Sequence, residues 1–214
     1  MKADKAPASR GRAQAEPPRG PAALPHEVRI IGGRWKRCKL PVANRPGLRP
    51  TPDRVRETLF NWLGQNLSGW RCLDVFAGSG ALGFEAASRD AAEVVLVERD
   101  PHLARSLRES KERLKVDVLK VECADAMAWM KRCAPQVFEL VFIDPPFDAD
   151  LTLPALAAAA RVVVVDGFVY LEAMRAFDDA GLMTLGLKLH RHARAGAVHF
   201  HLLQRVAQDY TAAA

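Results

Sequence analysis

A tetrapeptide near the middle of the second half of the chain combines a carboxylate, a rigid backbone and an aromatic ring. It reads D-P-P-F, from Asp144 through Pro145 and Pro146 to Phe147, and it follows the apolar run FELVFI. The Asp144 carboxylate and the Pro145 carbonyl, held in an extended geometry by the prolines, can both accept hydrogen bonds from an exocyclic amine of a nucleobase. Such acceptors stabilise the positive charge that develops on this nitrogen during methyl transfer, and Phe147 can stack on the base. The tetrapeptide therefore indicates methyl transfer to a base amine.

A glycine-rich segment, CLDVFAGSGALGFEA, contains a pattern that is typical of nucleotide binding. Gly78, Gly80 and Gly83 form a G-x-G-x-x-G, in which glycines allow the backbone to approach a bound ligand closely. Glu98 follows Gly78 by 20 residues, a spacing at which an acidic residue binds the ribose of NAD or of any other adenosine cofactor. These residues leave the identity of the cofactor open.

Asp74, which lies four residues before Gly78, discriminates between the possible cofactors. A carboxylate beside the loop repels a pyrophosphate and attracts an ammonium or sulfonium group. S-adenosyl-L-methionine has both of these cationic groups, whereas NAD has a pyrophosphate. Since the sequence also lacks an evident group for handling a hydride, we expect S-adenosyl-L-methionine as the cofactor, and a redox enzyme is disfavoured.

Alternating strands and helices are expected to position these residues. From residue 71 onward, short apolar runs alternate with segments whose apolar residues recur at helical spacing. This pattern predicts an α/β fold with a doubly wound, mostly parallel sheet, and two final strands joined near Gly196 would add an antiparallel hairpin. Ligands bind beyond the carboxyl ends of such strands, which is where Asp74 and D-P-P-F are expected. The expected strands are 72–76, 94–98, 116–122, 138–144 and 167–173, and the expected helices are about 80–89, 103–114, 151–160 and a short one around Met127 and Trp129.

Positive charge is concentrated in the first quarter of the chain. The net charge is +6, yet residues 1–58 contain 14 Lys or Arg and 5 Asp or Glu, against 17 and 20 in the remaining residues. This asymmetry favours a polyanionic partner, nucleic acid before a membrane surface. Residues 28–42 are expected to form a hairpin whose second strand surrounds Trp35 with cations, a combination that suits phosphate contact and base stacking. These cations are Arg34, Lys36, Arg37 and Lys39.

The N-terminal region divides into a tail and a segment that packs on the rest of the protein. Residues 1–27 are rich in Pro, Ala, Gly and Arg and have almost no large apolar side chains, so we expect a disordered basic tail. A helix is expected over 51–66, with Thr51 as its N-cap. We therefore expect an RNA-binding hairpin and helix over 28–69 and a methyltransferase domain over 70–208.

Cysteine, hydropathy and histidine patterns favour a protein that binds neither a membrane nor a metal. The four cysteines are scattered without a C-x-x-C pair, which is typical of reduced thiols in a cytoplasmic protein. No run of about 18 apolar residues is present, so no membrane span is expected. Four histidines alternate along the last two expected strands, and without matching acids or cysteines we expect exposed strand residues rather than metal ligands. They are His190, His192, His199 and His201.

Four segments resemble the RsmD-type family, the 16S ribosomal RNA guanine-N2 methyltransferases. They are VRIIGGRWKRCKLPV, GLRPTPDRVRETLFNWL, CLDVFAGSGALGFEA and FELVFIDPPF, and the likeness extends over about 28–206. The block R-P-T-x-D-R-V-R-E-T-L-F discriminates best, because D-P-P-F also occurs in amino methyltransferases with other substrates. The resemblance implies a seven-stranded Rossmann-like methyltransferase sheet, S-adenosyl-L-methionine as cofactor, and 16S rRNA as partner within an assembled or assembling 30S subunit. It also implies a monomeric protein.

The resemblance also implies roles for individual residues. The cofactor's methionine end would lie against Asp74, Phe76, Ala77, Gly78 and Gly80; Glu98 and Arg99 would flank its ribose, and Asp125 and Ala126 its adenine. Asp144, Pro145, Pro146 and Phe147 would bind the guanine, and Arg49, Arg54 and Arg56 would join the hairpin cations in gripping RNA. Cys38 and the C-terminal run LHRHARAGAVHFHL depart from the expected pattern.

Two other functions remain compatible with the sequence. The same motifs could serve an amino methyltransferase that acts on adenine or cytosine in another RNA or in DNA. A non-catalytic RNA-binding protein that keeps only the fold is also conceivable, although the intact D-P-P-F and glycine loop count against it.

Overall fold

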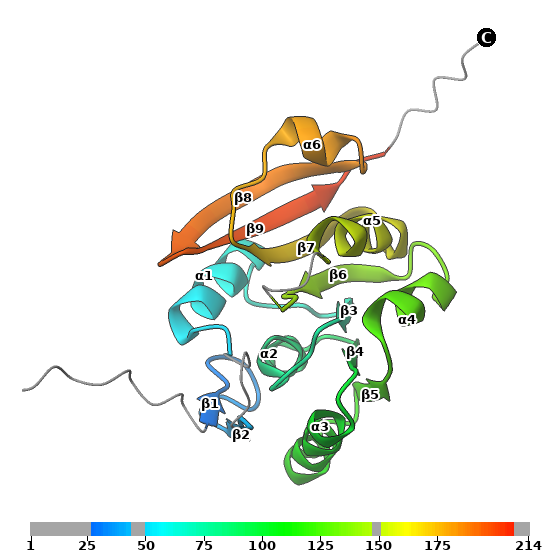
Figure 1. Ribbon diagram of the computed structural model, residues 1–214. Coiled ribbons are helices and arrows are strands. Elements are labelled where there is room, and N and C mark those ends of the chain that lie inside the picture. Colours follow the sequence, from blue (N-terminus) through cyan, green and yellow to red (C-terminus); the bar gives the residue numbers. More distant parts are fainter. Residues whose placement is uncertain (1–26, 44–49, 147–150, 208–214) are drawn as a thin grey trace, which may run out of the picture.

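A seven-stranded sheet organises the molecule (Figure 1). The computed structural model describes residues 27–43, 50–146 and 151–207. The strand order is β5-β4-β3-β6-β7-β9-β8. The strands are β3 (Arg71–Asp74), β4 (Glu93–Glu98), β5 (Leu119–Cys123), β6 (Phe138–Ile143), β7 (Val163–Ala173), β8 (Leu187–Ala195) and β9 (Val198–Arg205).

The strand directions confirm the predicted doubly wound α/β fold. The five strands β5, β4, β3, β6 and β7 pair in parallel, and β9 inserts antiparallel between β7 and β8. Chain order reverses beside β3, whose neighbours are β4 and β6. A crevice at the carboxyl ends of the strands is expected at such a switch point.

Helices cover both faces of the sheet and create two apolar cores. One core joins residues of α1, α2 and α3, and the other joins residues of α4, α5 and α6. Trp62 of α1 stacks on Phe200 of β9 with ring centroids 5.3 Å apart, so α1 is held against the C-terminal hairpin. The helices are α1 (Asp53–Leu63), α2 (Ala81–Ser88), α3 (Pro101–Leu114), α4 (Ala126–Arg132), α5 (Thr152–Val162) and α6 (Asp179–Met183).

The N-terminal hairpin is present, but its strands are shorter than predicted. Glu27–Arg29 (β1) pairs antiparallel with Lys39–Pro41 (β2). Trp35 lies in the connection between them and not on a strand, so that part of the prediction was wrong. Its indole Nε1 donates to the carbonyl of Leu114 at 2.8 Å and its half-buried ring packs against the core. Trp35 therefore fixes this connection on α3 through its indole N–H and its packing.

Helix α1 begins without the predicted Thr51 cap. The N-cap is Pro52, which makes no side-chain cap bond, and the Thr51 hydroxyl donates instead to Glu172 Oε1 at 2.8 Å. The helix ends at Gly64, whose φ of 93° is a left-handed conformation that favours glycine. The sequence predicted a helix cap because a cap is a bond to a nearby residue. The hydroxyl of Thr51 instead bonds a residue that lies 121 positions away in the sequence.

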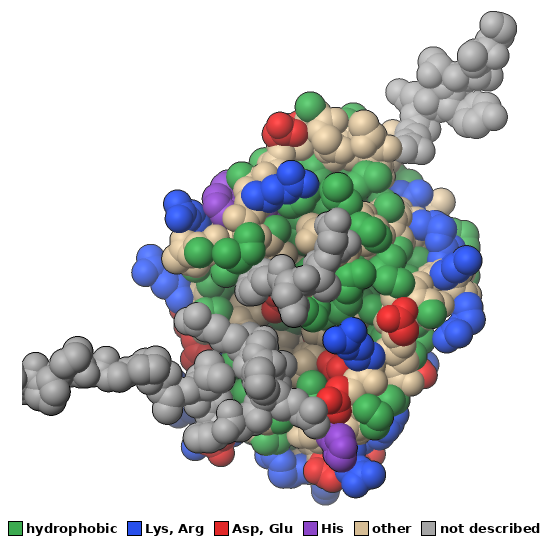
Figure 2. Space-filling model, viewed as in Figure 1, with side chains coloured by type: hydrophobic (Ala, Val, Ile, Leu, Met, Phe, Trp, Pro, Cys, Tyr) green, Lys and Arg blue, Asp and Glu red, His purple; other side chains and the backbone are tan. Residues whose placement is uncertain are grey.

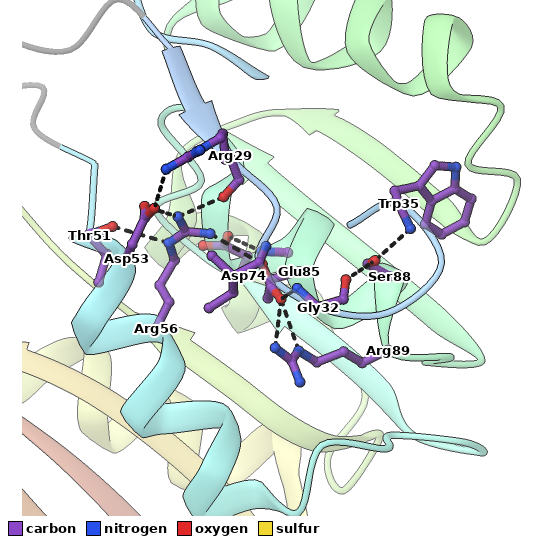
Figure 3. Close-up of polar contacts among 12 residues, drawn as sticks. Arg29, Gly32, Trp35, Thr51, Asp53, Arg56, Asp74, Glu85, Ser88 and Arg89 are labelled. Carbon is purple, nitrogen blue, oxygen red and sulfur yellow. Dashed lines mark hydrogen bonds and ion pairs between the residues drawn. The ribbon is translucent and has the colours of Figure 1, made fainter. Parts of the chain in front are cut away.

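A buried carboxylate on α2 ties this N-terminal region to the sheet domain (Figure 3). Glu85 has no exposed surface and accepts hydrogen bonds from the backbone N–H groups of Ile31 and Gly32, both at 2.8 Å. Its carboxylate also pairs with two guanidinium groups, from Arg56 of α1 at 3.2 Å and from Arg89 at 2.8 Å. The chain before α1, α1 itself and α2 therefore share a single acceptor.

Arg56 is a structural residue, which corrects its predicted role in gripping RNA. Its side chain has no exposed surface, so a phosphate cannot reach the guanidinium. Besides Glu85, it bonds Asp53 at 2.6 Å and donates to the carbonyl oxygens of Arg29 and Thr51 at 2.8 and 3.2 Å. Arg56 thus fixes the backbone of Thr51 at the entrance to α1.

Replacement of Glu85 is expected to cost much of the stability of the protein. The change Glu85→Gln leaves two buried guanidinium groups beside a neutral amide, and breaking a buried pair in this way costs about 3–5 kcal/mol. Urea denaturation should show this loss as a lower midpoint at an unchanged slope.

A matched control is Glu93→Gln, which removes an exposed pair with Lys120. Exposed pairs contribute little, so we expect this change to cost less than a third as much. Equal losses in the two variants would contradict the central role of Glu85.

Candidate active site

A cavity of about 740 Å³ lies at the carboxyl ends of the parallel strands. Segments that follow β3, β4, β5 and β6 line it, together with the start of α1 and the tip of the β8–β9 hairpin. Figure 2 shows one face of the molecule, on which hydrophobic side chains occupy much of the area right of the centre, and Lys and Arg side chains lie around the edge and beside red acidic side chains near the centre. The cavity occupies the position that the doubly wound fold predicts for a ligand.

Most of the residues expected to bind a cofactor or to act in catalysis line this cavity. Gly80 is the exception, because it lies outside the lining; its φ of 77° is a left-handed conformation that favours glycine. Phe147 lies outside the described residues. Those that line the cavity are Asp74, Phe76, Ala77, Gly78, Glu98, Arg99, Asp125, Ala126, Asp144, Pro145 and Pro146.

Asp74 is the most buried of the acidic residues that line the cavity. It ends β3, is 2% exposed, and its Oδ2 accepts from the backbone N–H of Gly83 at 3.1 Å. Burial raises the pKa of this carboxyl to about 7; the N–H of Gly83 partly offsets the rise and the charge of Glu98 adds to it. A cation bound beside Asp74 would stabilise its ionised form.

Glu98 shapes the glycine loop. Its two carboxylate oxygens accept from the backbone N–H groups of Gly78 at 2.9 Å and of Asp100 at 2.8 Å. These bonds hold Gly78 at a φ of 52°, in the left-handed region. The predicted contact of Glu98 with a ribose would use the remaining lone pairs of the same oxygens, and it stays a prediction.

Asp144 has an acidic neighbour, Glu172, that the sequence patterns did not reveal. Ile143 of β6 is in register with Leu171 of β7. The residues that follow them, Asp144 and Glu172, therefore lie side by side. Thr51 lies within reach of both, at 2.8 Å from Glu172 Oε1 and 3.5 Å from Asp144 Oδ2. The signal in the sequence was the acid that follows the run GFVYL, which becomes significant only once the strand order is known.

The two carboxyl groups share a low-polarity environment. Burial raises the pKa of Asp144 well above its ordinary value, and the negative charges of Glu172 and Asp74 add to this effect. Burial also raises the pKa of Glu172, against hydrogen bonds from Thr51 and from Tyr170, whose hydroxyl donates to Oε1 at 2.8 Å. The pair is therefore expected to hold a proton more readily than exposed carboxylates do.

The cavity as a whole is acidic. Among the described residues that line it, one is basic, Arg99, and six are acidic: Asp74, Glu98, Asp100, Asp125, Asp144 and Glu172. Such a lining attracts a ligand with positive charge and hydrogen-bond donors, and it repels a pyrophosphate. The choice of S-adenosyl-L-methionine over NAD stays a prediction.

The remaining predicted RNA contacts lie outside the cavity. Arg34 is exposed with its guanidinium 5.2 Å from the ring centre of Trp35, and Lys39 pairs with Glu27 at 2.6 Å. Lys36, Arg37 and Arg54 are exposed, whereas Arg49 lies outside the described residues. Nothing in this arrangement tests RNA binding, which stays a prediction for these side chains.

Three of the four histidines stack on one another across β8 and β9. The rings of His192 and His199 lie 5.2 Å apart and share a 2.9 Å hydrogen bond, and His201 lies 4.6 Å from His192. His201 is buried, contrary to the expectation that these residues are exposed.

Within the described ranges, no group of three or more His, Cys, Asp or Glu side chains is arranged to hold a metal ion. No helix of these ranges is long and apolar enough to cross a membrane.

Comparisons with known proteins identify relatives of the whole folded region. Residues 28–204 match the family model described as "Conserved hypothetical protein 95". The ribosomal RNA small subunit methyltransferase D of Escherichia coli is 42% identical over 188 residues, which cover 85% of this chain and 92% of that protein. The protein of the same name from Haemophilus influenzae is 46% identical over 134 residues, 61% of this chain and 69% of that protein.

Solved structures show the same likeness. A putative methyltransferase from Escherichia coli superposes with a TM-score of 0.74 at 37% identity, covering 85% of this chain and 99% of that one. A putative methylase from Haemophilus influenzae gives a TM-score of 0.70 at 33% identity, with the same coverage. The matched segments include the D-P-P motif, the glycine loop and the N-terminal region. The chain therefore belongs to the RsmD-type family of ribosomal RNA methyltransferases, as the resemblance of its motifs predicted.

Proposed function

We propose that this protein transfers a methyl group from S-adenosyl-L-methionine to the N2 amine of a guanine in 16S rRNA of the small ribosomal subunit. One observation carries the proposal: Asp144 and Pro145 line the same acidic cavity as Asp74 and Glu98. An acceptor for a base amine and a binding site for a cationic cofactor thus adjoin, which a methyl transfer requires. The names of the relatives indicate small-subunit ribosomal RNA as the substrate. We expect 16S rRNA in an assembled or assembling subunit.

The residues of the cavity fit S-adenosyl-L-methionine. When bound, the cofactor supplies an electrophilic methyl group on a sulfonium centre. Asp74, a buried carboxyl that lacks a basic partner among the described residues, would pair with the α-ammonium group. Glu98 would hold the ribose, and Asp125 with Ala126 would flank the adenine. A cavity of about 740 Å³ is within the range of sites that enclose cofactors.

Asp144 and Pro145 would prepare the attacking nitrogen. A base amine is a poor nucleophile because its lone pair is delocalised into the ring. Hydrogen bonds from its two protons to the Asp144 carboxylate and to the Pro145 carbonyl draw this nitrogen toward a tetrahedral geometry and stabilise its positive charge. As the new N–C bond forms, the C–S bond breaks, and the nitrogen then loses one proton. Asp144, whose pKa is raised by burial, is suited to receive that proton.

The N-terminal surface would hold RNA outside the cavity. The acidic cavity repels phosphates, so the backbone of the substrate must be held elsewhere while a single base enters. Arg34, Lys36 and Arg37 are exposed on the β1–β2 connection and offer positive charge. We propose that these side chains, with Lys39 and Arg54, grip the RNA, that the protein acts as a monomer, and that it is cytoplasmic.

Loss of the Asp144 carboxylate should abolish transfer while the cofactor still binds. For Asp144→Ala we expect a turnover at least about 100-fold lower, the usual cost of removing a group that stabilises developing charge. Single-turnover assays with labelled S-adenosyl-L-methionine and unmethylated small subunits measure transfer, and equilibrium dialysis measures cofactor binding.

The control is Asp178→Ala, which removes the side-chain cap of α6, an element that does not line the cavity. Near-normal turnover of Asp144→Ala would refute the mechanism. A loss of turnover caused only by lost cofactor binding would refute the assigned role of Asp144.

Cofactor affinity should increase with pH as Asp74 ionises. The neutral acid, which predominates below a pKa of about 7, cannot pair with an ammonium group, whereas the carboxylate above it can. Protons therefore compete with the cofactor, and its affinity should increase about tenfold between pH 5.5 and 7. Calorimetric titration of the wild type and of Asp74→Asn checks this, because the variant should bind weakly at both values. An equal pH dependence in the variant would assign the effect to another group.

Neutralising the hairpin cations should weaken RNA binding in a salt-dependent way. The triple change Arg34→Gln, Lys36→Gln and Arg37→Gln should lower the magnitude of the slope of log K against log salt by about 2. Filter binding to small-subunit rRNA over a range of salt measures this slope. Point changes are preferable to truncation, because Val28, Ile30 and Leu40 belong to the core. The matched control changes Arg105, Lys131 and Arg132, exposed on α3 and α4; an equal slope change in both would rule out a specific RNA-binding surface.

A further inference from the structure

Glu172 is a second carboxylate in the cavity, and the D-P-P chemistry does not require it. Acceptors for an exocyclic amine serve adenine, cytosine and guanine equally, so Asp144 and Pro145 cannot select the base. We propose that Glu172 determines the specificity for guanine, by accepting a hydrogen bond from guanine N1–H through its Oε2 atom. This inference rests on the proposed function and adds to it the residue that reads the base.

The two oxygens of Glu172 have different surroundings. Oε1 accepts from both Thr51 and Tyr170, each at 2.8 Å. Oε2 accepts no hydrogen bond from any described residue, and the same holds for Oδ1 of Asp144. No fully buried side-chain nitrogen or oxygen in the described part of the chain lacks a partner, and both residues line the cavity. Each carboxyl therefore has one oxygen without a partner among the described residues, on a side chain that lines the cavity.

The relative position of these oxygens follows from the sheet. Ile143 and Leu171 are paired on adjacent parallel strands, which lie about 4.8 Å apart. Asp144 and Glu172 follow them, and both reach the hydroxyl of Thr51. An amine held by Asp144 therefore has Glu172 beside it, at the place of the neighbouring ring atom.

The neighbouring ring atom distinguishes guanine from the other bases. In guanine, the N2 amine adjoins N1–H, so the edge offers three donors in a row. In adenine and cytosine, the atom beside the amine is an unprotonated ring nitrogen with a lone pair. A carboxylate oxygen at this position bonds N1–H of guanine and faces a lone pair in either of the other bases. A buried carboxylate oxygen that faces a lone pair has no hydrogen to accept, and the cost of this unpaired acceptor discriminates strongly against adenine and cytosine.

Three residues hold Glu172 ready as an acceptor. Thr51 and Tyr170 donate to Oε1, which partly offsets the rise that burial causes in the pKa of Glu172 and leaves Oε2 as the oxygen without a described partner. Asp144 is more distant from the shared hydroxyl, at 3.5 Å, and therefore receives less of this support. Arg56 in turn holds the backbone of Thr51 at 3.2 Å. Glu172 is thus connected, through Thr51 and Arg56, to the buried Glu85 network that fixes the N-terminal region.

An analogue of guanine tests the proposal directly. 2,6-Diaminopurine keeps the N2 amine but has a lone pair at N1 in place of the N–H. The position that the wild-type protein methylates is first located by nucleoside analysis, and small-subunit rRNA with either base at that position is then assembled into particles. We expect the wild type to prefer guanine by about 100-fold or more in kcat/KM. Glu172→Gln, whose amide can donate to the lone pair, should reduce this preference at least tenfold.

The control is Tyr170→Phe, which removes one hydrogen bond to Oε1 and leaves the carboxylate in place. This variant should keep the preference for guanine to within about threefold, whatever its overall rate. An unchanged preference in Glu172→Gln overturns the inference, and so does a wild type that methylates both bases equally well. The second comparison needs no variant, so it decides the question even where Glu172→Gln does not fold. Absence of N2-methylguanosine with the wild type would instead refute the proposed function.

Discussion

A buried carboxylate that binds two guanidinium groups is the interaction on which the active region depends. Glu85 neutralises Arg56 and Arg89 and accepts from the backbone of Ile31 and Gly32 in a space without exposed surface. Charges of this kind are tolerated in an interior only when they are paired and hydrogen-bonded. The order of the chain before α1 therefore follows from charge satisfaction as well as from apolar packing. Thr51, whose carbonyl accepts from Arg56, reaches the active site as a result.

The distribution of charge separates two tasks that would otherwise conflict. Six of the described residues that line the cavity are acidic, which suits a cationic ligand and the donor edge of a base and repels phosphate. The substrate, however, is a polyanion, so its backbone must be bound at a distance from these acids. Basic residues are concentrated before residue 59, and the exposed ones among the described residues lie outside the cavity lining. The opposite charges of the two regions fit a mechanism in which a single base leaves the RNA and enters the site.

The sequence was sufficient for those parts of the site that follow directly from strand ends. Asp144 closes an apolar run and Asp74 ends β3, two residues before the end of the expected strand, and parallel strands place such residues at one edge of the sheet. Arg56 was misassigned because its surroundings in the sequence are basic, and burial depends on Glu85, which lies 29 residues away. The predictions for Trp35 and Thr51 were wrong for the same reason, because the partners of these residues come from α3 and β7. Local patterns describe which groups are available, and tertiary contacts decide how each one is used.

Glu172 shows how the sheet combines a shared reaction with an individual substrate. Asp144 and Pro145, the proposed hydrogen-bond acceptors for the base amine, follow β6, which is next to the central strand β3. β7 is the next strand outward, and Glu172 lies one residue before its end. The parallel register of Ile143 with Leu171 places that residue beside the reacting group. Replacement of the acid at position 172 by an amide or an apolar residue would alter which base edge fits, while the reaction chemistry would stay the same. In the proposed mechanism, recognition of the base belongs to the strand beside the one that carries Asp144, so the two functions lie on separate elements.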